Sequence, residues 1–228
     1  MFERRAYLLD ITDRCPNRRT MQELVDVLAR FRYTDFLLYD AAEAAVDLGK
    51  TALYCQMQGL SFRVVGEGFL REVEGDEKTV MAPTFAARSL CGRIEEMREA
   101  MDRAEAAGRA RGATRFVVAD LSDGYAWHPP CVSLPAIILA GNLMTAGRAA
   151  AKMDLEKDLC AVMDLPVGGL LQKLGTLYLR GGARRADASE YSNILAGDVG
   201  YSRHPGITQP VLDDVSAVAR AVRLALER

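Results

Sequence analysis

Apolar and polar residues recur along this chain in two periods, one typical of strands and the other of helices. Short β-prone runs cover residues 5–11, 34–39, 62–65 and 114–120. Helical spacing of apolar side chains covers residues 20–32, 41–59 and 89–112, and the pattern is mostly helical from residue 136 onward. Strands that alternate with helices are typical of a parallel sheet, so we expect an α/β fold.

Local signals refine these elements. Thr20, with Glu23 three residues later, predicts a capping box at the start of the first helix. Gly59 predicts the end of the second helix. The segment 71–81 indicates a hairpin or a short loop around Gly75 that leads into one more strand. The sequence therefore predicts about five strands, most of them parallel.

Carboxylates stand at the ends of four predicted strands. They are Asp10, Asp40, Glu67 and Asp120. Because parallel strands end at one edge of a sheet, and ligands bind at that edge, we expect these acids to share a rim. After Asp120 the chain continues through Asp123, Trp127 and His128, which extend this candidate site. The alternative is that the strand-end acids make turns and Trp127 packs in the core.

Composition narrows the function classes. The 228 residues have a formal net charge of −2, which gives no electrostatic reason to bind nucleic acid or an anionic membrane. No apolar run is long enough to span a bilayer, and no apolar signal segment opens the chain. The five cysteines form no metal-type pair and indicate a reducing compartment, so we expect a cytoplasmic protein. With two histidines and no phosphate-binding glycine loop, we predict neither a metal nor a cofactor.

Several segments, taken in order, carry a resemblance to a known family. They are residues 5–12 (Arg-Ala-Tyr-Leu-Leu-Asp-Ile-Thr), 31–39, 54–60 with Phe69, 82–84 with 89–93, and 113–130. Together they resemble strands of the catalytic barrel of the family-20 glycoside hydrolases, the β-N-acetylhexosaminidases, across roughly residues 4–180. The resemblance implies a (β/α) barrel with an N-acetylhexosamine-type sugar at its rim. It also implies that Arg5 binds sugar hydroxyls, with Asp40, Asp120, Asp123, Trp127 and His128 as further contacts.

One part of that family's pattern is missing. The family's chemistry needs an Asp-Glu pair at the end of the fourth strand, where the Glu protonates the leaving oxygen. Here only 13 positions separate Phe69 from Ala82, and one crossover alone takes about 10–12 residues. Asp76 and Glu77 do form a pair, but Gly-Asp between two β-prone runs is typical of a turn. The catalytic group is therefore unknown, with Glu67, Asp76 and Glu77 as weak candidates.

A complete barrel takes about 250 residues, so this chain is expected to hold a reduced or incomplete one. We predict a shortened barrel-like domain over residues 1–147 and a helical extension packed on it over residues 148–228. Since exposed sheet edges invite pairing, we also expect a homo-oligomer.

Three functions stay open at this point. The first is a catalytically reduced domain that keeps a carbohydrate-type pocket at the strand ends. The second is an active glycoside hydrolase with relocated carboxylates, drawn from Glu67, Asp76, Glu77, Asp120 and Asp123. The third is a structural or interaction protein without a sugar site. Because the usual acid is missing, the first hypothesis is favoured over an active enzyme.

Overall fold

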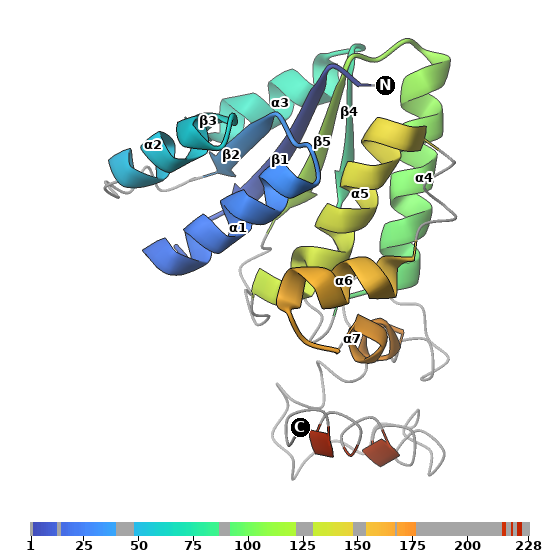
Figure 1. The fold of residues 1–228 in the computed structure, drawn as a ribbon. Helices are drawn as coiled ribbons and strands as arrows, with labels where there is room; N and C mark the ends of the chain where they lie inside the picture. Colours follow the sequence, from blue (N-terminus) through green and yellow to red (C-terminus); the bar gives the residue numbers. More distant parts are fainter. Residues whose placement is uncertain are drawn as a thin grey trace, which may run out of the picture.

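A five-stranded, all-parallel sheet forms the centre of the protein in the computed structural model (Figure 1). The structure describes residues 2–12, 15–39, 48–86, 92–121, 130–147, 154–166 and 168–176, with positions 216, 217, 220, 223 and 224. The strands are β1 (Arg4–Asp10), β2 (Asp35–Tyr39), β3 (Ser61–Val65), β4 (Thr79–Pro83) and β5 (Arg115–Asp120). Their order is β3-β2-β1-β5-β4, and every pairing is parallel. The predicted α/β class and strand number are confirmed.

Helices connect and cover these strands. They are α1 (Arg18–Arg30), α2 (Gly49–Met57), α3 (Glu67–Gly75), α4 (Ile94–Ala110), α5 (Leu134–Ala146), α6 (Leu155–Met163) and α7 (Gly168–Leu174), with a 3₁₀ turn η1 (Pro130–Ser133) before α5. Gly59 lies just beyond α2 with φ +78°, the left-handed conformation of a helix stop, as predicted. The start of α1 differs from the prediction. Asn17 caps it by accepting a hydrogen bond from the Thr20 amide, so Thr20 lies inside the helix.

The strand order resembles that of a barrel that has been opened. Strands β1, β2 and β3 are neighbours in chain order, as are β4 and β5, and β5 returns to pair with β1. A closed barrel would need one more pairing, between β3 and β4, and these strands instead form the two edges. The described sheet is therefore an open, reduced barrel-like sheet.

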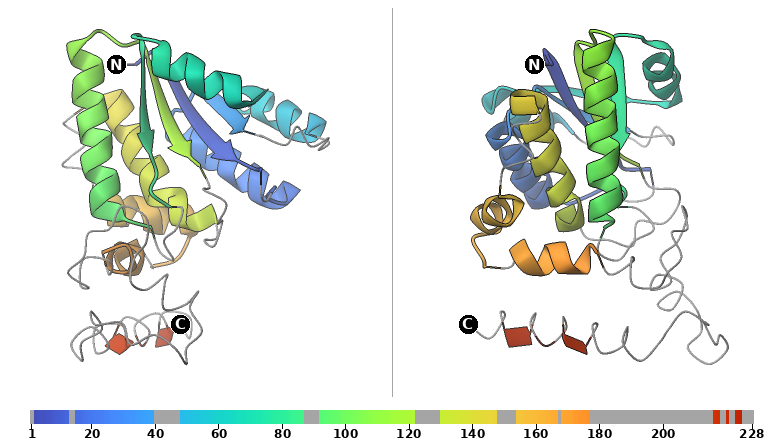
Figure 2. Two further views of the ribbon diagram at one scale, coloured as in Figure 1. Left: turned by 180° about the vertical axis from the view of Figure 1, so that it is seen from behind. Right: turned by 90° about the vertical axis from the view of Figure 1, so that its right-hand side faces the viewer.

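The connection from β3 to β4 contains helix α3, so the expected hairpin is wrong, whereas the short turn after Gly75 that leads into one more strand is present. Parallel strands cannot be joined by a hairpin and need a crossover. Phe69 and Val73, one helical turn apart, pack against Ala6, Leu8 and Leu37 on the sheet. Along the sheet, the crossover from β3 to β4 runs in the opposite direction to the crossover from β1 to β2. Because both crossovers are right-handed, α3 covers the face of the sheet opposite to that of α1 (Figure 2).

The larger core lies on the face that α1, α4 and α5 cover. Tyr7, Phe36 and Phe116 are fully buried there, with Phe36 stacked against Tyr7. Helix α5 is apolar on almost all sides, which is typical of a buried helix, and the Tyr33 hydroxyl donates to its Ile137 carbonyl at 2.9 Å.

The segment after residue 147 is described in part. Leu155 and Leu159 of α6 are buried in the larger core, so this helix packs on the sheet domain. Within the described part of the chain, no helix is long and apolar enough to span a membrane.

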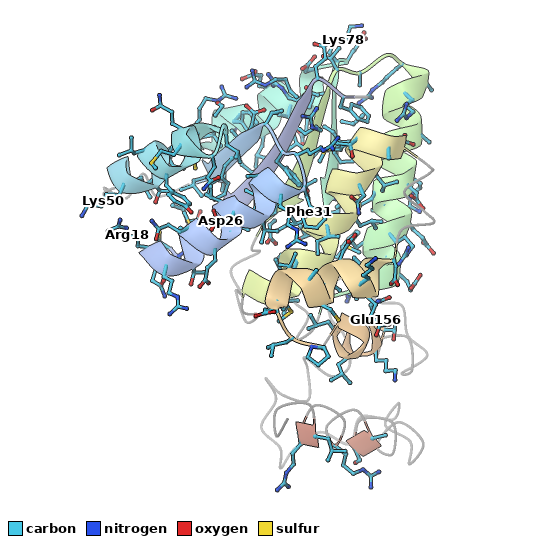
Figure 3. All side chains as sticks on the ribbon, viewed as in Figure 1. Arg18, Asp26, Phe31, Lys50, Lys78 and Glu156 are labelled. Atoms are coloured by element: carbon cyan, nitrogen blue, oxygen red, sulfur yellow. The ribbon has the colours of Figure 1, made fainter. Side chains whose placement is uncertain are left out.

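Gly141 marks the closest approach of α5 to the rest of the core. A Cβ atom there would lie 2.7 Å from both the Cβ atom and the carbonyl oxygen of Phe31, which Figure 3 labels at the end of α1. We predict that Gly141→Ala lowers the free energy of unfolding, because overpacking costs about 1–3 kcal/mol and helix propensity returns at most about 1 kcal/mol. Chemical denaturation measures this.

The matched control is Gly68→Ala in α3, where no atom lies within 4 Å of the added Cβ. That variant should be as stable as the parent or more stable, by up to about 1 kcal/mol. Equal behaviour of the two variants would contradict close packing at Gly141.

Candidate functional site

The carboxyl edge of the sheet holds two groups of polar side chains, one on each face. Side chains alternate between faces along a strand. Asp10 is the register partner of Tyr39, so these two point to the α3 face. Asp120 is the partner of Leu9 and points to the opposite face, beneath α5. The predicted common rim is thus divided by the sheet itself.

Asp120 is buried, with 6% of its surface exposed, and accepts three hydroxyl hydrogen bonds. The Tyr7 hydroxyl donates to Oδ2 at 2.6 Å and the Ser133 hydroxyl to the same oxygen at 2.5 Å. The Thr84 hydroxyl donates to Oδ1 at 2.7 Å. These donors come from β1, from η1 and from the segment after β4, so one carboxylate joins four parts of the chain.

The three hydroxyl donors stabilise a negative charge on the buried Asp120. Hydrogen bonds to an ionised group are the strong ones, and a buried carboxylate needs them. Ser133 immediately precedes α5, so the amino end of that helix adds a favourable dipole. Burial raises the pKa of Tyr7 well above 10.0, and the negative charge of Asp120 raises it further. The geometry gives Asp120 a scaffolding role.

The second group, on the α3 face, centres on Tyr39. Its ring is partly buried against the smaller cluster that includes Phe69 and Leu121. Burial raises the pKa of Tyr39, and the nearby negative charges of Glu67 and Asp10 raise it further. Because β2 is between β1 and β3 in the sheet, Tyr39 lies between two carboxylates, one at the end of β1 and the other at the start of α3. We call Asp10, Tyr39 and Glu67 the tyrosine rim.

Contacts within the tyrosine rim hold the Asp10 carboxylate and leave that of Glu67 exposed. Asp10 accepts a hydrogen bond from the Thr12 amide at 2.9 Å, which holds its carboxylate at the end of the strand. Glu67 and Arg71 are both exposed and lie 3.7 Å apart, a weak surface ion pair. An aromatic ring beside carboxylate acceptors suits a ligand with an apolar face and several hydroxyl donors.

Three predicted site residues lie at the opposite, amino edge of the sheet. Arg5 is at the start of β1, where its guanidinium donates to the Arg32 carbonyl at 2.5 Å and to the Phe2 carbonyl at 2.7 Å. Asp76 and Glu77 lie between α3 and β4, next to Lys78, which Figure 3 labels at that edge.

Local contacts explain the position of Asp76. It accepts hydrogen bonds from the Lys78 amide and the Thr79 hydroxyl, which lower the pKa of its carboxyl. The predicted turn at this position is therefore present, although it follows a helix. These residues are not brought together with Asp120 or with the tyrosine rim.

The remaining predicted contacts, Asp40, Asp123, Trp127 and His128, lie outside the described residues. Within the described residues, no group of three or more histidine, cysteine or acidic side chains is placed to hold a metal ion. A cavity of about 420 Å³ lies between α4 and the end of α5, lined by Glu105, Ala106, Arg109, Ala146 and Gly147. It includes neither Asp120 nor any residue of the tyrosine rim.

Tyr39 was not predicted as a site residue, although it immediately precedes Asp40. The available signal was its spacing of two residues from Leu37, which places both side chains on the same face of β2. Tyr7, Thr84 and Ser133 were also missed as partners of Asp120, and they are 13 to 113 positions away in sequence. No local sequence pattern marks the pairing of Asp120 with Thr84 or with Ser133.

We predict that Asp120→Asn lowers the free energy of unfolding by about 1.5–3 kcal/mol, because hydrogen bonds to a charged acceptor are weakened or lost. Chemical denaturation measures it. Asp26→Asn is the matched control, because Asp26 accepts a tyrosine hydroxyl, that of Tyr54 at 2.7 Å, on the exposed surface. That change should stay within about 0.5 kcal/mol of the parent. Equal losses would contradict the scaffolding role of Asp120.

Alkaline pH should also unfold the protein. Burial raises the pKa of Tyr7 and of Tyr33 well above 10.0, so the unfolded chain releases these protons first. Their contribution to stability is complete below pH 10.0 and falls as the pH rises above it. Tyrosinate absorbance should show at least these two phenols ionising together with unfolding, and Tyr7→Phe should lessen the alkaline loss. Ionisation of all tyrosines in the folded state would contradict this burial.

Comparison with known proteins supplies no family for this chain. No protein-family model matches the sequence, and no curated protein matches it. The resemblance to family-20 glycoside hydrolases therefore stays a hypothesis that depends on the residues themselves.

Proposed function

We propose that this protein binds N-acetylhexosamine-type sugars at the carboxyl edge of its sheet without hydrolysing them. The observation that carries the proposal is the tyrosine rim, in which Tyr39 lies between the carboxylates of Asp10 and Glu67. The barrel-like strand order and the segments that resemble the hexosaminidase barrel are consistent with a sugar ligand.

Sugar recognition uses the chemistry that this rim contains. A sugar ring has apolar C–H faces that pack on an aromatic ring, and hydroxyl groups that donate to carboxylates. Asp40, which follows Tyr39, and Asp123, Trp127 and His128, which follow β5, come from the same edge and are proposed as further contacts. Arg5 is no longer proposed, because it lies at the other edge and its guanidinium donates to backbone carbonyls.

The positions of the acids favour binding over hydrolysis. Glycosidases place two carboxyl groups about 5–10 Å apart on either side of the scissile bond. Of the described candidate acids, Asp120 is buried beneath α5, and Asp76 and Glu77 lie at the amino edge. Among these candidates only Glu67 lies in the tyrosine rim, and the other carboxylate of that rim, Asp10, accepts a hydrogen bond from the Thr12 amide.

A second candidate function is hydrolysis with Asp10 and Glu67 as the acid pair. It is favoured by one observation, that Asp10 at the end of β1 and Glu67 at the start of α3 flank Tyr39 at the carboxyl edge of the sheet. In that case one group would protonate the leaving oxygen, and the other would activate water or attack the anomeric carbon.

We also propose the cytoplasm as the location of this protein. The thiols of Cys55 and Cys160 are free, and burial raises the pKa of Cys55 to about 11. Thiols of this kind persist in a reducing compartment.

The binding proposal is tested by titrating the protein with β-linked N-acetylglucosamine oligomers, followed by calorimetry or by NMR shifts. We expect binding that Tyr39→Ala weakens about tenfold or more, which corresponds to about 1.4 kcal/mol for the lost ring contact. The matched control is Tyr54→Ala in α2, whose hydroxyl donates to the exposed Asp26 (labelled in Figure 3), away from the rim. It should bind like the parent.

Turnover is measured with an aryl N-acetylglucosaminide, and none is expected. Hydrolysis that Asp10→Asn or Glu67→Gln abolishes would establish the second candidate instead. If the folded protein shows neither binding nor turnover, both candidate functions are overturned.

A further inference from the structure

The two edges of the sheet differ in how their backbone groups are satisfied. In a parallel ladder, alternate residues of an edge strand bond to the neighbouring strand and the others point outward. The Ser61 amide donates to the Thr34 carbonyl, so Ser61, Arg63 and Val65 bond toward β2. The amide and carbonyl groups of Phe62 and Val64 therefore point away from the sheet. No partner for them lies among the residues that the structure describes.

The β4 edge is blocked by its own neighbours. The outward Thr79 amide donates to the Asp76 carbonyl at 3.0 Å, and the Thr79 carbonyl accepts from the Arg111 guanidinium. Pro83 has no amide hydrogen to offer. Of the outward positions on β4, Met81 keeps both an amide and a carbonyl that could pair, whereas Pro83 offers a carbonyl alone. An added strand therefore has a place at β3 and not at β4.

We propose that β3 pairs antiparallel with β3 of a second copy of this chain, which joins two five-stranded sheets into one. This inference goes beyond the proposed sugar binding and does not depend on it. A two-fold axis relates identical surfaces, so the same strand supplies donors and acceptors on both sides. An exposed edge strand is the ready template for such pairing.

Charge selects the register of this pairing. If Phe62 were opposite Val64 of the partner subunit, Arg63 would face the partner's Arg63 directly, and like charges at that position are destabilising. In the register that places Val64 opposite the partner's Val64, these two residues exchange both hydrogen bonds. Arg63 then faces the partner's Val65 and lies diagonal to the partner's Glu67.

The side chains at this edge suit that register. Arg63 is the register partner of Leu37, so it points to the α3 face, on the side where α3 begins with Glu67. Both are exposed, so each is accessible to the opposite charge across the axis. On the other face Val64 has 52% of its surface exposed, and contact with the partner's Val64 would cover it.

The pairing is tested by sedimentation velocity over a range of protein concentrations. We expect a concentration-dependent species of about twice the 25.0 kDa chain mass, because a five-residue strand pair is a small interface. Val64→Lys should raise the dimer Kd about tenfold or more, since it places two lysines opposite each other. The matched control is Leu53→Lys, an equally exposed apolar residue on α2. It should leave Kd unchanged.

A charge exchange tests the register without removing the strand. Arg63→Glu should weaken the dimer, and the double variant Arg63→Glu with Glu67→Arg should restore it, because each new pair is again opposite in charge. Thermal melting monitored by circular dichroism checks that every variant folds. A parent that stays monomeric, a dimer that Val64→Lys does not weaken, or a double variant no better than Arg63→Glu would overturn the proposal. A sugar-binding result affects none of these outcomes.

Discussion

The architecture depends on one constraint, the short connection from β3 to β4. These strands are the two edges of the sheet, four inter-strand gaps or about 19 Å apart. Helix α3, with nine residues, spans about 13.5 Å of that distance and the flanking residues span the rest. Because the crossover must be right-handed, α3 lies on the face that would be the inside of a barrel. One short segment thus keeps the sheet open and fills the inner face with Phe69 and Val73.

The open sheet determines where chemistry is available. Successive side chains of a strand point to opposite faces of the sheet. Two acids at the ends of different strands can therefore lie on opposite faces and be far apart in space. Asp120 lies on the face of α5, where three hydroxyl groups enclose it, and Asp10 lies on the face of α3, beside Tyr39. The buried carboxylate holds β1, β5 and the start of α5 in position. The tyrosine rim lies on the other face, where we propose the ligand contact.

The same geometry separates the two proposals that concern partners. The proposed sugar site uses the carboxyl ends of β1 and β2, whereas the proposed self-association uses the outer side of β3. Both proposals involve Glu67, the first residue of α3, because it belongs to the tyrosine rim and also follows the edge strand β3. Since one is read out by ligand titration and the other by molecular mass, each can fail without the other.

The sequence by itself determined the elements that local periodicity encodes. Met21, Leu24, Val25 and Leu28 recur at helical spacing and are all buried in α1, and the apolar runs of β1, β2 and β5 form the central strands. Periodicity could not reveal α3, because Gly75-Asp76 is typical of a hairpin turn and only the parallel direction of β4 requires a helix there. It also could not place Arg5, Asp76 and Glu77 at one edge of the sheet and Asp120 at the other. Tertiary structure alone decided the partners of Asp120, because Tyr7, Thr84 and Ser133 meet it only when the chain has brought β4, β5 and β1 side by side.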